Sequence, residues 1–180
     1  MKTDTVNDIV KEDTSDDKRQ AYQTAIKLLT TREHSAFELT QKLKKRAYSR
    51  TIIENLLLDL QNKGYQSDAR FAEQFTRQRY TKGYGPLSIR AKLYERGIDS
   101  GLAADALTEL QVDWVEHAVE VIGQKFRSDV ITSTEPKIES RIARFLHTRG
   151  FSSSVALRAL KQSRRDQQRT TCSSVGQTSR

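Results

Sequence analysis

The feature that most constrains this chain is a pattern that recurs three times, at offsets of 50 and then 53 residues. Each copy has an apolar stripe at helical spacing, then an arginine, a turn residue, an apolar residue and a helix-capping residue. The equivalent positions are Leu39, Ile89 and Ile142; Leu43, Leu93 and Leu146; Arg46, Arg96 and Arg149; Ala47, Gly97 and Gly150; Tyr48, Ile98 and Phe151; and Ser49, Asp99 and Ser152. Such a repeat predicts supersecondary units that are too thin to bury their own apolar faces and therefore stack on their neighbours.

The composition favours helices over strands. Glycine occurs 8 times and proline twice in 180 residues, whereas strand-rich folds need many turns. We therefore predict an all-α fold, an elongated array of three tandem three-helix repeats. The repeats are expected at residues 18–65, 66–111 and 112–161, between a disordered acidic tail at 1–17 and a disordered basic tail at 162–180.

The middle repeat shows the pattern most fully. Phe71 and Phe75 are four residues apart and mark the buried face of a helix. Residues 83–86, Gly-Tyr-Gly-Pro, break this helix. Pro86 suits the first turn of the next helix, because its missing N–H has no helical partner there. Gly97 then suits the left-handed residue that ends this second helix.

Four local expectations complete the predicted fold. Asp68 precedes the Phe71 stripe and can cap its helix. The second helix of the first repeat is expected to bury Phe37 together with two leucines. Ala47 stands where the other repeats have glycine, so the first repeat is expected to turn differently, because alanine tolerates the left-handed conformation less well. Residues 128–136 are expected to form a loop.

The positive charge lies mainly in the body of the chain. The formal net charge is +8, but residues 1–17 hold six acids against two lysines, and residues 161–180 hold five bases against one aspartate. The body between these ends therefore carries +8 by itself. A basic body suggests a polyanionic partner, either nucleic acid or a protein filament formed on nucleic acid. The alternative is a helical protein whose lysine- and arginine-rich faces are simply solvated.

The sequence lacks a convergent set of catalytic groups. The three histidines lie far apart and match no metal-ligand spacing, and the single cysteine, Cys172, lies in the polar tail. Glycines at 83 and 85 could suggest a phosphate loop, but no strand precedes them and no third glycine follows, so a helix–helix turn is favoured. We expect no enzyme, no cofactor and no metal. With neither a signal peptide nor a membrane-spanning run visible, we expect a cytoplasmic protein that does not bind membranes.

The remaining chemistry is that of a basic binding surface. The candidate residues for contacts with a partner or with DNA are Arg70, Arg77, Arg79, Lys82, Tyr84, Arg90, Lys92 and Arg96 in the middle repeat, Lys42, Lys45 and Arg46 in the first, and Arg144 and Arg149 in the third. The spacing of Phe71 and Phe75 favours core packing over base stacking. Tyr80 and Tyr84 flank the turn and are better candidates for an exposed contact, although Tyr84 could instead fix the loop.

The recurrent arginine has two interpretations. At positions 46, 96 and 149 a cation follows the apolar stripe of a helix. A cation near a helix C-terminus stabilises the helix by roughly 0.3–1 kcal/mol. Alternatively, the three arginines form a row of contacts with a partner. The sequence leaves both interpretations open.

The ordered set of motifs resembles the RecX family, regulatory proteins that act on the bacterial RecA recombinase. The resemblance covers about residues 21–160, and the residues that carry it are Arg32–Ser35, Glu38–Leu39, Lys42–Leu43, Arg70–Ala72, Phe75, Arg77, Arg79, Gly83–Pro86, Ile89, Leu93, Gly97 and Ile98. It implies a protein that binds the RecA filament on single-stranded DNA. It also implies that the protein limits filament growth and suppresses strand exchange, ATP hydrolysis and the co-protease role of the filament in the SOS response.

Two other functions remain open at this point. The basic faces could form a direct nucleic-acid-binding module whose affinity falls steeply with salt, because it acts through phosphate contacts. Alternatively, the chain could be a structural adaptor whose positive charge serves solubility.

Overall fold

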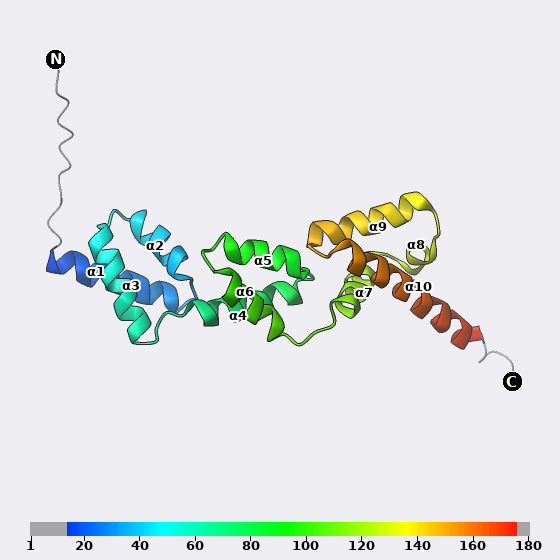
Figure 1. Cartoon of the computed structure of the whole chain (residues 1–180), viewed down its shortest axis with the longest axis horizontal. Coiled ribbons are helices and arrows are strands. Elements are labelled where there is room, and N and C mark those ends of the chain that lie inside the picture. Colours follow the sequence, from blue (N-terminus) through cyan, green and yellow to red (C-terminus); the bar gives the residue numbers. More distant parts are fainter. Residues whose placement is uncertain (1–13, 176–180) are drawn as a thin grey trace, which may run out of the picture. The chain divides into compact units, whose positions relative to one another are not determined.

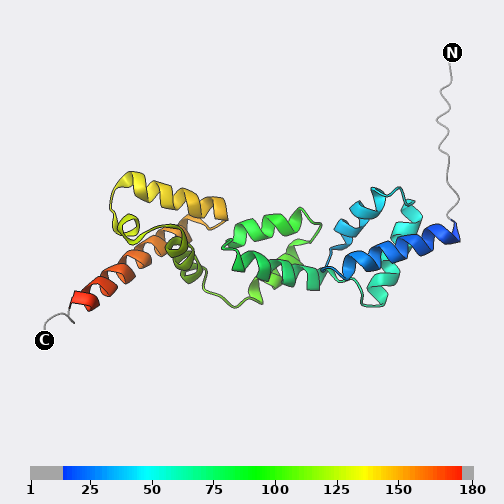
Figure 2. The same cartoon turned by 180° about the vertical axis from the view of Figure 1, so that it is seen from behind.

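A computed structural model describes residues 14–175, and every regular element in this range is a helix, with no strand. The chain divides into two compact units, residues 1–71 and 72–180, and each is described by itself. Figures 1 and 2 show the helices of each unit from opposite sides. The helices are α1 (Ser15–Leu29), α2 (Ala36–Lys44), α3 (Arg50–Asn62), α4 (Asp68–Thr81), α5 (Pro86–Tyr94), α6 (Ser100–Thr108), α7 (Trp114–Lys125), α8 (Ser128–Thr132), α9 (Pro136–Arg149) and α10 (Ser153–Val175).

The first unit packs α1, α2 and α3 around one apolar cluster. The buried side chains of this cluster are Ala21, Ala25, Leu39, Leu43, Ile52, Ile53, Leu56 and Leu60. Ser49 caps α3, since its hydroxyl oxygen accepts the N–H of Ile52 at 3.2 Å. The stripe and the cap predicted for this repeat are therefore confirmed.

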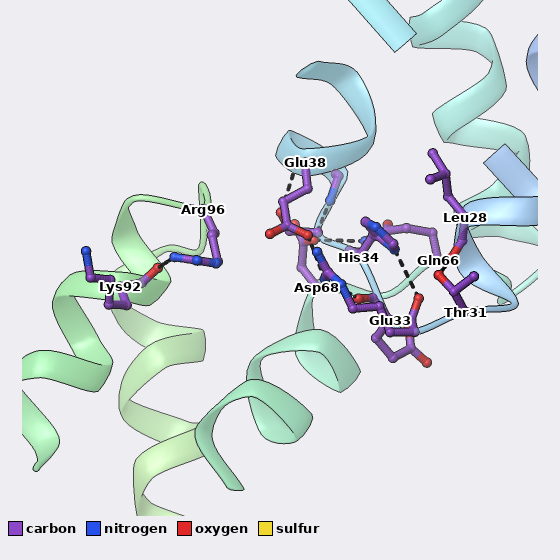
Figure 3. Close-up of polar contacts among 12 residues, drawn as sticks. Leu28, Thr31, Glu33, His34, Glu38, Gln66, Asp68, Lys92 and Arg96 are labelled. Carbon is purple, nitrogen blue, oxygen red and sulfur yellow. Dashed lines mark hydrogen bonds and ion pairs between the residues drawn. The ribbon is translucent and has the colours of Figure 1, made fainter. Parts of the chain in front are cut away.

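Asp68 does not have its predicted role. The side chain of Ser67 accepts the Arg70 N–H at the start of α4, at 3.3 Å. The Asp68 carboxylate instead accepts the N–H of Ala36 at 2.8 Å and the side-chain amide of Gln66 at 2.8 Å. Asp68 thus satisfies an N–H at the beginning of α2, which a local reading of the sequence could not reveal (Figure 3).

Phe37 and Ala47 also differ from expectation. Phe37 is 45% exposed. It lies two residues before Leu39, so a helix that buries Leu39 and Leu43 turns Phe37 away from the core. Ala47 has φ 61°, the left-handed conformation that Gly97 adopts at φ 75°. The first repeat therefore turns as the others do, although the left-handed conformation is sterically unfavourable for alanine.

The second unit begins with the helices of the middle repeat. The core side chains Phe75, Ile89, Leu93 and Ile98 are buried. Pro86 is the first residue of α5, as predicted. The N–H of Ile98 bonds to the carbonyl of Leu93 at 3.1 Å and closes the predicted helix end.

The last repeat packs α7, α8, α9 and α10 around a second cluster (Figure 1). Its fully buried members include Ile122, Ile131, Ile142, Leu146 and Phe151. Residues 128–132, expected to belong to a loop, form the short helix α8 because the buried Ile131 anchors them in this cluster.

The helices extend further into the predicted tails than expected. Helix α1 begins at Ser15, where Thr14 and Asp17 form a capping box. Helix α10 continues past Gln162 to Val175. Arg164 supports this extension, because its guanidinium donates to the carbonyls of Ile131 and Ser133 and to the Glu139 carboxylate. The remainder of both predicted tails, residues 1–13 and 176–180, lies outside the described residues.

Candidate partner-binding surface

The structure separates the candidate cations into two groups. The first group is exposed, and its side chains make no hydrogen bond or ion pair with residues 14–169, the part of the chain whose side chains the structure describes. Its members are Lys42, Lys45 and Arg46 in the first unit, and Arg77, Lys82, Arg90 and Arg144 in the second. These charges are available to a partner without breaking an internal contact.

In the first unit the available cations gather at the end of α2. Lys42 lies in its last turn, and Lys45 and Arg46 follow directly. The carbonyl end of a helix carries a partial negative charge, which three nearby cations balance. Arg46 also lines a shallow hollow between α1 and the turn after α2, together with Gln23, Lys27 and Tyr48.

The second group of cations is engaged within the protein. Nε of Arg70 pairs with Glu33 at 2.9 Å, and its Nη2 donates to the carbonyls of Gly64 and Tyr65 at 2.9 and 3.2 Å. Arg70 therefore stabilises the turn that precedes α4. Lys92 pairs with the neighbouring Glu95 at 2.8 Å, and this hydrogen bond lowers the pKa of Glu95.

Residues 82–87 and 149–151 bond to each other, and we call this contact the repeat joint. The N–H of Gly85 donates to the carbonyl of Arg149 at 2.8 Å, and the N–H of Leu87 donates to the carbonyl of Gly150 at 3.1 Å. A Cβ on Gly85 would lie 2.5 Å from the carbonyl oxygen of Gly150. Glycine is therefore needed at position 85 because two backbones meet there.

Arginine–aromatic contacts surround the repeat joint. The guanidinium carbons of Arg79 and Arg149 lie 5.1 and 5.0 Å from the centre of the Tyr84 ring. Arg79 lies 5.1 Å from the Phe75 ring as well, and Arg149 donates to the carbonyl of Lys82 at 2.8 Å. Two guanidinium groups thus contact the Tyr84 ring at distances typical of cation–π contacts, and these contacts fix the loop in place.

The recurrent arginine serves a different purpose in each repeat. Arg46 is exposed. Arg96 lies 4.7 Å from the Phe75 ring and donates to the carbonyl of Lys92 at 2.8 Å, so it bonds the last turn of α5 (Figure 3). Arg149 belongs to the repeat joint. Of the three arginines, only Arg46 belongs to the first group, whose exposed side chains can contact a partner.

Two buried histidines lie one in each unit. His34 is 2% exposed, its Nδ1 lies 3.0 Å from the carbonyl oxygen of Arg32, and its own carbonyl accepts from Gln66 at 3.2 Å (Figure 3). His117 is 5% exposed and stacks on Tyr80, with ring centres 4.0 Å apart. Burial lowers the pKa of both imidazoles, and the Glu120 carboxylate near His117 opposes this only in part.

Within the described range, residues 14–175, no group of histidine, cysteine or acidic side chains could hold a metal ion. In the same part of the chain, no helix is long and apolar enough to cross a membrane.

The comparisons with known proteins agree with this architecture. Residues 21–60 match the family profile described as "RecX, first three-helix domain", and residues 67–107 match "RecX, second three-helix domain". The regulatory protein RecX of Legionella pneumophila (strain Corby) is 40% identical over 144 residues, which cover 79% of this chain and 94% of that one. This chain belongs to the RecX family of regulatory proteins. Its RecX relative from Pseudomonas entomophila (strain L48) is 41% identical over 130 residues, covering 72% of this chain and 83% of that one.

Solved RecX structures share the fold. The crystal structure of RecX from Lactobacillus salivarius superposes with a TM-score of 0.73 and 24% identity, over 83% of this chain and 98% of that one. A second structure, titled regulatory protein RecX, gives a TM-score of 0.67 and 26% identity, over 78% of this chain and 70% of that one. The curated relatives are named regulatory proteins.

Sequence reasoning missed the repeat joint. The turn glycines at 85 and 150 were visible as helix-ending residues, but nothing local shows that they face each other. The one signal that could have pointed to the joint is the second glycine of the Gly83–Pro86 motif. Gly85 has φ −85°, which any residue can adopt, so only a close approach explains a glycine there.

Proposed function

We propose that this protein binds the RecA filament on single-stranded DNA in the cytoplasm and inhibits its extension, ATPase, strand exchange and co-protease activities. The observation that carries the proposal is membership of the RecX family together with available cations in both units. The contact set that we propose is Lys42, Lys45, Arg46, Arg77, Lys82, Arg90 and Arg144. The other candidate residues support this surface through contacts inside the protein; they are Arg70, Arg79, Tyr84, Lys92, Arg96 and Arg149.

A filament on DNA suits such a surface for a physical reason. It is a repeating lattice of protein and phosphate, and long-range attraction between a basic ligand and such a polyanion speeds association. Each unit carries its own exposed cations, so one chain can make two sets of contacts. Engagement of both sets raises the overall affinity without a need for tight contacts in either.

The first test is fluorescence anisotropy of labelled protein against two targets. One target is bare single-stranded DNA, and the other is the same DNA coated with RecA and a slowly hydrolysed nucleotide, both across a salt series. The proposal predicts tight binding to the filament, and weaker binding to bare DNA that falls steeply with salt. Equal affinity and equal salt dependence for both targets would contradict a filament-specific role.

Charge reversal then tests the surface. Arg77→Glu with Lys82→Glu is expected to weaken filament binding and relieve inhibition of RecA ATPase. The matched control is Lys18→Glu with Lys137→Glu, which makes the same change in net charge at exposed positions in the first turns of α1 and α9. Acids are favourable at helix N-termini, so the control keeps its fold. Equal loss in both variants would show that only net charge matters.

Direct binding to DNA is the second candidate function. The observation in its favour is that the side chains of the available cations make no hydrogen bond or ion pair with the described residues, and side chains in that state can contact phosphates. Binding to bare DNA with the same affinity as to the coated DNA would favour this function over filament recognition.

A further inference from the structure

A basic groove runs along α10, outside the candidate surface already described. It has a volume of about 370 Å³ and is lined by Val115 of α7 and six residues of α10. Four of the six are the cations Arg158, Lys161, Arg165 and Arg169. Sequence reasoning placed the end of this segment in a disordered tail, so it could not bring these residues together.

The helical spacing aligns these cations in one row. At 100° per residue, Arg158, Arg165 and Arg169 fall within an arc of about 40°, and Lys161 lies about 60° to one side. With a rise of 1.5 Å per residue, the row is about 16 Å long. At about 3.4 Å per nucleotide along one strand, it spans about five phosphates.

The neighbouring Arg164 shows that α10 divides its arginines between two tasks. Arg164 is on the other side of the helix, where it donates to the carbonyls of Ile131 and Ser133 and to the Glu139 carboxylate. In contrast, Arg158, Arg165 and Arg169 are exposed, and their side chains make no hydrogen bond or ion pair with the side chains that the structure describes, residues 14–169. The positive charges of this row therefore take no part in the contacts that hold the described fold together.

The chemistry of the groove favours phosphates as its ligand. Guanidinium groups bind phosphate oxygens in pairs of parallel hydrogen bonds. The groove has no aromatic ring on which a base could stack, and Val115 is its one apolar lining residue. An acidic helical peptide would usually need apolar pockets for its anchors. Asp166 lies in the lining and reduces the net charge there from +4 to +3.

We propose that the α10 groove is a binding site for the phosphodiester backbone of a nucleic acid strand, without base specificity. This inference rests on the proposed function, since it names the surface of the second unit that contacts nucleic acid. It adds residues that lie outside the contact set proposed above.

The test uses the full-length protein and a labelled thymidine oligonucleotide longer than the ~4–16 nucleotides typical of one single-strand site. The groove variant is Arg158→Gln with Arg165→Gln and Arg169→Gln. The control is Lys125→Gln with Arg127→Gln and Lys137→Gln, which removes the same charge from exposed positions outside the groove. Glutamine is a good helix former, and far-UV circular dichroism verifies that both variants remain helical.

Loss of three phosphate contacts reduces the slope of log affinity against log salt by about 2 in magnitude, at about 0.7 per single-strand phosphate. We expect that reduction, with affinity about tenfold weaker near 0.1 M salt, in the groove variant alone. The same slope in both variants would overturn the inference, as would an intact protein that does not bind the oligonucleotide. Selective loss of binding to poly-glutamate, with oligonucleotide binding unchanged, would overturn it in favour of an acidic protein partner.

The same variants separate this inference from the proposed function. If the intact protein binds the RecA filament but the groove variant keeps its oligonucleotide slope, the groove assignment fails and filament regulation stands. If the groove variant loses its slope but the intact protein does not bind the filament, the groove assignment stands and filament regulation fails.

Discussion

The turn after α2 and the turn after α9 occupy equivalent places in their repeats, but the side chain and backbone of the second make long-range contacts that the first does not make. In the first unit, Arg46 is exposed and Ala47 adopts the left-handed conformation at φ 61°. In the second unit, Arg149 stacks on Tyr84, and Gly150 at φ 89° accepts the N–H of Leu87. The turn after α2 requires only that its residue adopt the left-handed conformation. The turn after α9 must in addition leave room for the backbone of residues 85–88, which passes close to Gly150.

The comparison teaches that a repeated sequence motif does not imply a repeated function. A position that is set by backbone conformation tolerates alanine at a cost of about 1–2 kcal/mol. A position that is set by a close approach tolerates nothing larger than glycine. In the same way, an arginine that is free at one turn can be structural at the next.

The largest effect is expected at the repeat joint. Gly85→Ala places a methyl group 2.5 Å from the carbonyl oxygen of Gly150, so the backbones must separate. We expect the second unit to lose about 2–4 kcal/mol of unfolding free energy through overpacking and lost hydrogen bonds. Chemical denaturation followed by circular dichroism measures this loss.

The matched control lies in the same unit. Gly123 is in α7, and a Cβ there would meet no atom within 4 Å. Gly123→Ala should stabilise the protein by about 0.5–1 kcal/mol, as expected for glycine-to-alanine changes inside helices. Equal destabilisation by both changes would remove the distinction between a close approach and an open glycine.

A smaller effect is expected from the arginine of the joint. Arg149→Gln removes the hydrogen bond to the Lys82 carbonyl and the contacts with the Tyr84 and Phe145 rings. We expect a loss of about 1–2 kcal/mol, from one hydrogen bond and partly buried cation–π contacts. Arg144→Gln, an exposed change on the same helix, should leave the unfolding free energy within about 0.5 kcal/mol. A neutral Arg149→Gln would show that the stacking is incidental.

Part of this architecture could be predicted from the sequence, and part could not. The apolar stripes and the caps at Ser49 and Asp99 depend on residues three or four positions apart, so periodicity reveals them. The meeting of Gly85 with Gly150 joins positions far apart in the chain, and its one local sign, the second glycine of residues 83–86, does not show which segment it meets. Distant contacts of the same kind decide whether an arginine side chain is bound within the protein. The sequence could therefore predict which residues carry positive charge, but not which of them can contact a partner.

The first turn offers a gain of stability instead of a loss. Ala47→Gly removes the left-handed strain of about 1–2 kcal/mol, but glycine loses about 0.4–1 kcal/mol through the greater entropy of the unfolded chain. We expect a net stabilisation of about 0.5–1 kcal/mol in equilibrium denaturation. The reciprocal change is Gly64→Ala, at φ 70° with no atom near its Cβ, which should cost a similar amount. A destabilising Ala47→Gly would mean that the turn is not strained.

The smallest effect is expected from pH, and both units should share it. Burial lowers the pKa of His34 and His117 in the folded protein below the ordinary value of 6.5. Below pH 6.5 the unfolded chain therefore binds protons that the folded chain does not, and stability falls as the pH drops toward the folded pKa values. Denaturation at about pH 7.5 and 5.5 should show this decrease, and His34→Gln and His117→Phe should each reduce it. A flat profile in the parent protein would contradict the burial of the imidazoles.

The most direct test of the contrast between the two turns is a paired measurement on Arg46→Gln and Arg149→Gln. Each variant is examined for its thermal midpoint and for its affinity toward RecA-coated single-stranded DNA by anisotropy. We predict that Arg46→Gln weakens filament binding at an unchanged midpoint, whereas Arg149→Gln lowers the midpoint. If Arg46→Gln lowers the midpoint and leaves filament binding intact, or if the two variants behave alike, the division between an available and a structural arginine is wrong.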